Sequence, residues 1–178
     1  MRVRFAGFGG QGIVMAAQLL GHGAVKDDLM AIQSSSYGSA ARGGNCAGDV
    51  TIETGEIYEI LPEEFDAMVV MSQPALAQYL PRLKKGGTLI TDAELVKVEN
   101  GAQYSCFAYP ATREAADKFG NKLFANILML GFTVGVEPMV NPDSLREVIR
   151  GAIKKRFVEK NLSAFDKGLN DGRQAAKK

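Results

Sequence analysis

The first candidate for chemistry is a glycine-rich segment near the N-terminus, Gly7-Phe8-Gly9-Gly10-Gln11-Gly12. It follows a short apolar run at residues 3–8 and precedes residues 13–20, whose apolar residues and alanines occupy every helical face. This order predicts a strand, a glycine turn and a buried helix. In that setting a G-x-G-x-x-G pattern is typical of a backbone cradle for a phosphate at a helix N-terminus. The alternative is a tight turn whose glycines serve only positive φ angles and close packing.

The second candidate is a run of small residues around one arginine, Ser36-Tyr37-Gly38-Ser39-Ala40-Ala41-Arg42-Gly43-Gly44. The guanidinium of Arg42 is suited to a carboxylate or a phosphate, although an intramolecular salt bridge that pins the loop is the alternative. Tyr37 either hydrogen-bonds a ligand or caps the loop. The candidate cofactor-binding residues are therefore Gly7, Gly9, Gly10, Gln11, Gly12, Tyr37, Arg42, Gly43 and Gly44.

Residues for nucleophilic or metal chemistry are scarce. The chain has one histidine, His22, and two cysteines, Cys46 and Cys106, with no C-x-x-C spacing. Such a set matches no recognised metal or iron-sulfur spacing and forms no convincing Ser-His-Asp or Cys-His group. We expect His22 in a surface or capping role at the end of the first helix and both cysteines in the core. No catalytic residue and no metal site is predicted on this chain.

A nicotinamide cofactor is disfavoured by the residues after the second strand. A dinucleotide-binding fold places Asp or Glu about 20 residues past the glycines to hold the ribose. Here residues 33–36 read Gln-Ser-Ser-Ser, and no Lys or Arg stands there for a 2′-phosphate. A free-standing nicotinamide-dependent oxidoreductase is therefore kept only as an alternative.

Length and composition predict a single domain over residues 1–178. The chain is 46% hydrophobic, and Lys+Arg 21 against Asp+Glu 20 provides no overall field for nucleic acid or an anionic membrane. The longest apolar run, residues 127–136, is too short to span a bilayer, and the N-terminus lacks the pattern of a signal peptide. We expect a cytoplasmic protein that binds neither membranes nor nucleic acid.

The order of predicted elements indicates an α/β fold, a Rossmann-like mostly parallel sheet with an inserted β-hairpin and C-terminal helices. A strand at 29–33 is followed by a long loop rich in small residues, from 34 to as far as 48, and then by hairpin strands at 46–53 and 56–61. A strand at 66–71, a helix at 74–83 ended by Gly86 and Gly87, and strands at 88–91 and 103–108 follow. Helices are expected at 111–119, 122–134 and 145–159, with a final segment to the C-terminus.

The C-terminal segment is basic and amphipathic. From residue 146 onward it holds 10 Lys and Arg against 4 Asp and Glu. Leu145, Ile149, Ile153 and Phe157 are spaced for one helical face. The opposite face is expected to be solvated, and docking on an acidic partner is the alternative.

Taken in order, these segments resemble the gamma subunit of 2-oxoacid:ferredoxin oxidoreductases, most closely the 2-oxoglutarate type. The similarity runs over nearly the whole chain. Besides the two loops described above, the matching segments are Met71-Ser72-Gln73, Tyr79-Leu80, Leu83-Lys84, Gly86-Gly87, Thr91-Asp92, Pro110-Ala111-Thr112, Ala125-Asn126 and Leu130-Gly131.

The resemblance implies a complex that converts a 2-oxoacid and coenzyme A into acyl-CoA, carbon dioxide and reduced ferredoxin. Thiamine diphosphate, magnesium and iron-sulfur clusters would be carried by alpha, beta and delta-type partner subunits. This chain would be inactive alone. Its glycine turn and its Arg42 loop would face the active-site cleft and help hold coenzyme A or close the thiamine pocket. A purely structural subunit, whose glycine turn binds nothing, is a further alternative.

One segment departs from the family pattern. The family usually has Pro-Glu where this chain has Ser39-Ala40. The carboxylate of a glutamate at position 40 is therefore missing, and the loop lacks the stiffness that proline gives.

Replacing Arg42 by Ala tests the role that the resemblance implies for this loop. The Arg42→Ala complex is expected to turn over more slowly or to need more coenzyme A while its subunits remain assembled. Steady-state kinetics of the purified complex measures both quantities. Unchanged kinetics would contradict the role assigned to Arg42.

Overall fold

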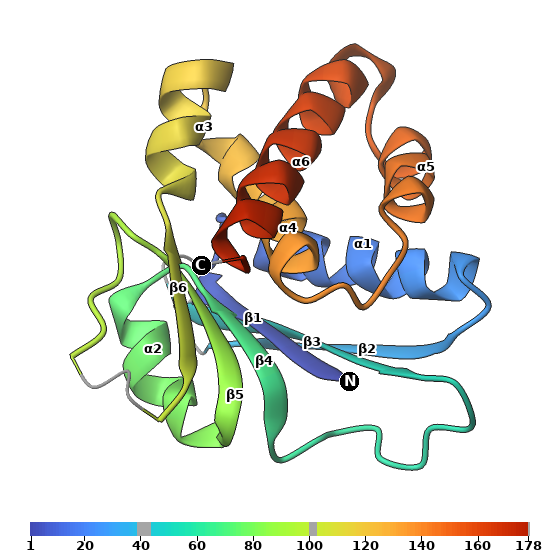
Figure 1. Cartoon of the computed structure of the whole chain (residues 1–178), viewed down its shortest axis with the longest axis vertical. Coiled ribbons are helices and arrows are strands. Elements are labelled where there is room, and N and C mark those ends of the chain that lie inside the picture. Colours follow the sequence, from blue (N-terminus) through green and yellow to red (C-terminus); the bar gives the residue numbers. More distant parts are fainter. Residues whose placement is uncertain (39–43, 100–102, 178) are drawn as a thin grey trace.

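A six-stranded sheet organises the protein, with strand order β2-β3-β1-β4-β5-β6 (Figure 1). The computed structural model describes residues 1–38, 44–99 and 103–177. β1, β4, β5 and β6 run parallel, whereas β3 runs antiparallel to both β1 and β2. The mostly parallel sheet expected from the sequence is confirmed. The strands are β1 (Arg2–Phe8), β2 (Met30–Tyr37), β3 (Asn45–Glu53), β4 (Phe65–Val70), β5 (Leu83–Asp92) and β6 (Ser105–Tyr109).

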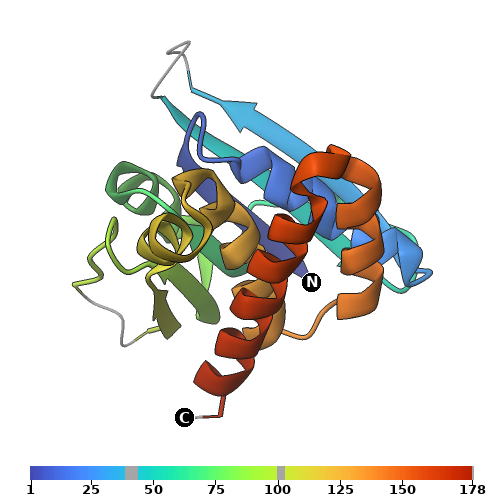
Figure 2. The same cartoon turned by 90° about the horizontal axis from the view of Figure 1, so that it is seen from above.

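Side-chain alternation along the central strands divides the core between the two sheet faces. Val3 and Phe5 of β1 pack into a large core with most of the helices, whereas Ala6 packs into a smaller core with α2 (Gln73–Tyr79). Figures 1 and 2 show the resulting helix layer, with α6 running across it. The helices on the large core are α1 (Ile13–Lys26), α3 (Ala111–Phe119), α4 (Ala125–Val136), α5 (Pro142–Ala152) and α6 (Lys155–Ala175).

The antiparallel pair differs from the predicted hairpin. Residues 56–61 do not form a strand, and Tyr58 and Leu61 are exposed. β3 pairs on one side with β2 and on the other with β1, so neither edge is left for a returning strand. β2 also extends to Tyr37, because Ser34, Ser35 and Ser36 pair with β3. The predicted loop therefore begins later than expected.

Two further boundaries differ from the prediction. Gly86 and Gly87 lie within β5 and do not end a helix, because α2 is followed by a short 3-10 helix, Leu80–Arg82, that leads directly into the strand. Gly86 has a φ of 76°, and β5 shifts register against β4 between Phe65 and Ala67. The glycines thus accommodate an irregularity of the strand.

The predicted helix at 145–159 is two helices, with a reversal at Ile153 and Lys154. Leu145 and Ile149 are buried as expected, but Phe157 is 41% exposed because it lies beyond the reversal. His22 is exposed near the end of α1, and Cys46 is buried in β3. Cys106 is exposed, contrary to expectation, because β6 is an edge strand.

Close packing of α4 on α6 depends on glycines in both helices. A Cβ at Gly168 would lie 2.9 Å from the Phe132 nitrogen and closer still to the Leu128 carbonyl oxygen. Gly131 is similarly close to the backbone of α6, with a Cβ position 2.9 Å from the Leu169 nitrogen. The two backbones therefore touch at positions where only hydrogen fits.

Gly168→Ala is expected to lower the free energy of unfolding by about 2–3 kcal/mol, because the added methyl group forces α4 and α6 apart. Urea unfolding monitored by circular dichroism measures the change. Gly151→Ala is the matched control, since Gly151 lies in α5 with no atom within 4 Å of its Cβ position. That control should be neutral or stabilising by up to about 1 kcal/mol. Equal destabilisation by both variants would contradict the packing argument.

Candidate functional site

The glycine turn lies where the chain order of the sheet reverses. From β1 the chain passes through α1 to β2 on one side, and from β4 it passes through α2 to β5 on the other. β1 and β4 are parallel neighbours, so their carboxyl ends lie together at this point. In open α/β sheets such a reversal leaves a crevice at the strand ends, where ligands bind.

The side-chain amide of Gln11 fixes the turn. Its Oε1 accepts a hydrogen bond from the Phe8 N–H at 2.6 Å, and its Nε2 donates to the Met71 carbonyl oxygen at 2.8 Å. One amide thereby joins the end of β1 to the residue that follows β4. Gln11 also fills the space beside Gly7, where a Cβ would lie 2.8 Å from Ile13 Cδ1. Gln11 therefore positions the turn through its side chain.

Two glycines of the turn adopt the left-handed conformation that favours glycine. Gly10 has a φ of 99°, and Gly12, the N-cap of α1, has a φ of 75°. A Cβ at Gly12 would lie 2.8 Å from Asn126 Cγ. Asn126 is buried at the start of α4 and donates through Nδ2 to the Gly12 carbonyl oxygen at 3.2 Å. The partners of this buried amide thus include the turn itself.

The second predicted segment meets the glycine turn through the backbone. The Gly9 N–H donates to the Gly44 carbonyl oxygen at 3.1 Å. Tyr37 lies at the carboxyl end of β2 and is 72% exposed. Arg42 and Gly43 lie outside the described residues. The structure thus brings Gly44 against the turn and places Tyr37 at the same edge of the sheet.

A cavity of about 260 Å³ opens beside Gly10 and Gln11. Among the described residues, the N–H groups of Gly10 and Gly12 donate no hydrogen bond, and the N-terminus of α1 adds its partial positive charge. Lys122 is exposed at the rim. This arrangement can hold an anionic group beside an apolar one. The cavity is lined by Gly10, Gln11, Met71, Leu95, Thr112, Lys122, Leu123 and Ala125.

Sequence reasoning did not predict that Asp92, Thr112 and Lys122 would contribute to this edge. Asp92 ends β5 fully buried, and its Oδ2 accepts hydrogen bonds from the Thr112 N–H at 2.8 Å and the Thr112 hydroxyl at 2.6 Å. The carboxylate therefore caps the start of α3. The available signal was an acidic residue at the end of one buried strand and Pro110-Ala111-Thr112 directly after the next strand.

The surroundings of the two thiols disfavour the thiolate form. Cys46 lies opposite Gly7 in the β1–β3 register, close to the turn. Burial raises the pKa of the Cys46 thiol and that of Cys106, which disfavours the reactive thiolate. Across the described residues, no three His, Cys, Asp or Glu side chains are grouped closely enough to hold a metal ion. None of the helices in these ranges is long and apolar enough to cross a membrane.

Comparison with known proteins decides the family. The model of the pyruvate ferredoxin/flavodoxin oxidoreductase family matches residues 2–170. This chain belongs to that family. Subunit KorC of 2-oxoglutarate synthase from Methanothermobacter marburgensis is 39% identical over 174 residues, and the alignment covers 93% of each chain. The resemblance predicted from the sequence, including its 2-oxoglutarate type, is confirmed.

Solved structures of the oxidoreductase family share this fold. The gamma subunit of a keto/oxoacid ferredoxin oxidoreductase from Geobacter sulfurreducens superposes with a TM-score of 0.86 at 32% identity, covering 97% of this chain and 98% of that one. A 2-oxoglutarate:ferredoxin oxidoreductase from Magnetococcus marinus, with 2-oxoglutarate, coenzyme A and succinyl-CoA bound, gives a TM-score of 0.88. It is 20% identical, and the match covers 98% of this chain but 31% of that one, so it shows the fold alone.

Gln11→Ala is expected to lower the free energy of unfolding by about 1–3 kcal/mol, because the Phe8 N–H and the Met71 carbonyl oxygen lose their partner. Thermal and urea unfolding of the purified chain check this value. Gln103→Ala is the control, since the exposed Gln103 side chain makes no hydrogen bond with the described residues, and it should change stability by less than about 0.5 kcal/mol. Equal stability of both variants would contradict the structural role of Gln11.

Proposed function

We propose that this chain is the gamma-type subunit of a 2-oxoacid:ferredoxin oxidoreductase that oxidises 2-oxoglutarate. The complex would form succinyl-CoA and carbon dioxide and pass the electrons to ferredoxin. The observation that carries this proposal is the match to a 2-oxoglutarate synthase subunit at 39% identity, which covers 93% of each chain. A match of that extent concerns the whole fold and both predicted loops, whereas a glycine motif alone occurs in many nucleotide-binding proteins.

The role proposed for this chain's own residues is to hold coenzyme A at the glycine turn. Coenzyme A combines phosphate groups with a long, weakly polar arm, and the cavity beside Gly10 combines N–H donors with an apolar lining. The N–H group of Gly10, which lines the cavity, would bind a phosphate oxygen, and Lys122 would balance its charge. Met71, Leu95 and Leu123 would contact the arm. Gln11 would keep the donors in place before the ligand arrives.

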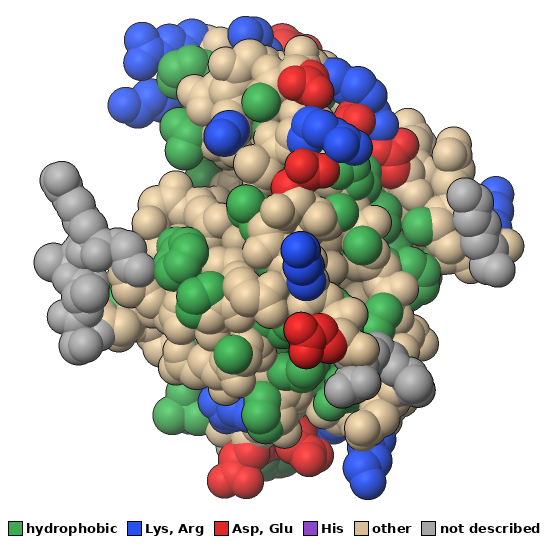
Figure 3. Space-filling model, turned by 90° about the vertical axis from the view of Figure 1, so that its left-hand side faces the viewer, with side chains coloured by type: hydrophobic (Ala, Val, Ile, Leu, Met, Phe, Trp, Pro, Cys, Tyr) green, Lys and Arg blue, Asp and Glu red, His purple; other side chains and the backbone are tan. Residues whose placement is uncertain are grey.

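The chemistry is assigned to partner subunits. Thiamine diphosphate with magnesium supplies the carbanion chemistry of decarboxylation, and iron-sulfur clusters supply the electron path. We place both on alpha, beta and delta-type subunits, with this chain inactive alone and the complex in the cytoplasm. The side of the molecule that carries α2 and α3 offers a surface for such partners. Figure 3 shows hydrophobic side chains scattered over this face, with basic and acidic side chains near its centre as well as toward its two ends.

Purification of the native complex through this chain tests the proposal. Larger subunits should co-purify, and the anaerobic reduction of viologen should depend on coenzyme A and be fastest with 2-oxoglutarate in a panel of 2-oxoacids. The isolated chain should show no activity. A solitary chain without such activity would contradict the proposal, and a better substrate in the panel would contradict the 2-oxoglutarate assignment.

Lys122→Ala tests the coenzyme A role separately. The variant complex should show a severalfold higher KM for coenzyme A and a nearly unchanged kcat, because a rim charge that binds the ligand equally before and during reaction affects binding alone. Lys85→Ala is the matched control, since Lys85 is an exposed lysine of β5 outside the cavity. If both variants keep the wild-type KM, coenzyme A does not contact this rim.

A further inference from the structure

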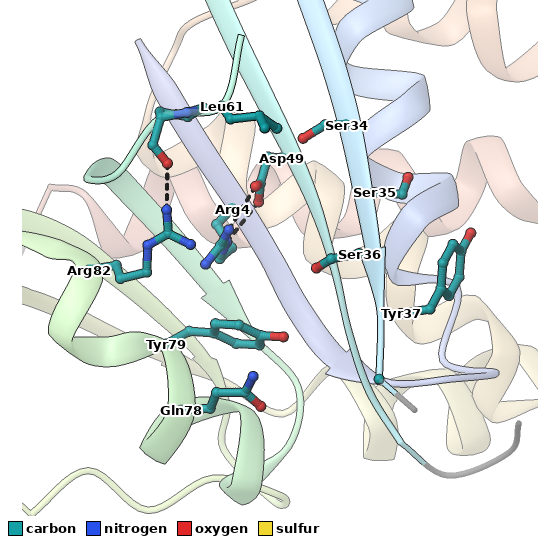
Figure 4. Close-up of a pocket in the computed structure, with 12 residues that line it drawn as sticks. Arg4, Ser34, Ser35, Ser36, Tyr37, Asp49, Leu61, Gln78, Tyr79 and Arg82 are labelled. Atoms are coloured by element: carbon teal, nitrogen blue, oxygen red, sulfur yellow. Dashed lines mark hydrogen bonds and ion pairs between the residues drawn. The ribbon is translucent and has the colours of Figure 1, made fainter. Parts of the chain in front are cut away.

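A second cavity, of about 420 Å³, lies on the face of the sheet that carries α2, opposite the larger helix layer (Figure 4). α2 covers this face over the central strands, where Leu76 and Tyr79 pack into the smaller core. β2 and β3 extend the sheet beyond the area that α2 covers. The cavity lies over this uncovered part of the sheet, beside α2. Its polar lining includes Arg4, Ser34, Ser36, Asp49, Gln78, Tyr79 and Arg82.

The floor of this cavity is a buried ion pair. Arg4 is 3% exposed, and its Nε and Nη2 each donate to an Asp49 carboxylate oxygen at 2.7 Å. The guanidinium carbon lies 4.2 Å from the ring centre of Phe65 and 4.7 Å from that of Tyr79. The guanidinium of Arg4 therefore neutralises the Asp49 carboxylate, and the rings of Phe65 and Tyr79 hold that guanidinium in place.

Arg82 supplies a positive charge that no carboxylate balances. Its Nε donates to the Glu63 carbonyl oxygen at 2.8 Å and its Nη2 to the Pro62 carbonyl oxygen at 2.6 Å. No Asp or Glu of the described chain lies within ion-pair distance of it. The two carbonyl groups hold the guanidinium along its Nε–Nη2 edge, which leaves both N–H groups of Nη1 and the second N–H group of Nη2 free to donate. The cavity lining thus has a net charge of +1, from two arginines and one aspartate.

Uncharged donors complete the lining. Ser34 and Ser36 pair in register with Asp49 and Ala47, so their side chains share the Asp49 face, and Figure 4 shows both hydroxyls directed toward the cavity. Tyr79 is 8% exposed, and its hydroxyl points into the same space. Within the described ranges, none of these three hydroxyls forms a hydrogen bond.

From this arrangement we infer that the cavity binds a phosphate monoester group. Phosphate has oxygens on every side, and the donors here approach from different elements: β2, α2 and Arg82. A carboxylate has only two oxygens in one plane, so it would leave part of these donors unpaired, whereas the three free oxygens of a phosphate monoester can accept from all of them. A cavity of this volume accommodates a small ligand that carries such a group. The inference does not depend on the function proposed above.

Binding measurements on the full chain test the inference. Isothermal titration calorimetry at low salt would use inorganic phosphate, coenzyme A and dephospho-coenzyme A, which lacks the 3′-phosphate. Wild-type chain should bind inorganic phosphate, and Arg82→Ala should weaken that binding at least tenfold. Tyr79→Phe and the double variant Ser34→Ala/Ser36→Ala should weaken it severalfold. These two changes remove hydroxyls while leaving the Arg82 tether intact.

Arg150→Ala is the matched control. Arg150 is exposed on α5, so this substitution removes the same charge from the other face of the sheet. Coenzyme A could bind at least tenfold more tightly than dephospho-coenzyme A, with Arg82→Ala abolishing the difference. In that case the phosphate group that occupies the cavity is the 3′-phosphate of coenzyme A. If the two bind equally while inorganic phosphate still competes with neither, the site takes a separate phosphorylated compound. Absence of phosphate binding, or equal binding by wild type and both hydroxyl variants, would overturn the inference. Because no readout is enzymatic, failure here leaves the proposed activity untouched.

Discussion

The hydrogen bonds of the Gln11 amide join the two halves of the sheet. From β1 and β4 the chain adds strands toward opposite edges of the sheet. The ends of these two strands must therefore be held at fixed positions, because α1 and α2 begin directly after them. Gln11 meets this requirement with one donor and one acceptor, to Phe8 and Met71. The left-handed glycines can then turn the chain tightly into α1 without disturbing the strand ends. The N–H donors of the turn are positioned by the same contacts that stabilise the fold.

Unequal cover on the two faces of the sheet explains where the second cavity arises. Of the α-helices in the described residues, five pack into the larger core and only α2 packs into the smaller one. A charged residue in a central strand is costly when buried without a partner. Arg4 is tolerated because Asp49 lies opposite it in the β1–β3 register and aromatic rings cover its guanidinium. The same ion pair forms the polar floor of the cavity in the part of the sheet that α2 does not cover, so a packing constraint determines the chemistry of the cavity.

Local signals in the sequence predicted those elements whose boundaries are set locally. The helix at 111–119 follows Pro110 and ends at Gly120, whose φ is 74°, and its predicted bounds are those observed. Strand pairing is not local, so the alternation in residues 46–53 indicated a strand without revealing that β1 and β2 would occupy both of its edges. The glycine turn was identified by its pattern, whereas Lys122 reaches it only through the tertiary fold. A single arginine inside the apolar run at residues 3–8 was the signal for the second cavity.

The geometry of the glycine turn also depends on a helix contact far from it in sequence. Asn126 holds the Gly12 carbonyl group from the start of α4, and α4 is itself positioned by its close packing on α6. That packing requires the four glycines 131, 135, 168 and 172, whose spacing of four residues puts each pair on one helical face. A change that separates the two helices would therefore move Asn126 and Ala125, and with them one wall of the cavity beside Gly10. The C-terminal helices thus help to position the wall of this cavity through α4, although α6 itself contributes no residue to its lining.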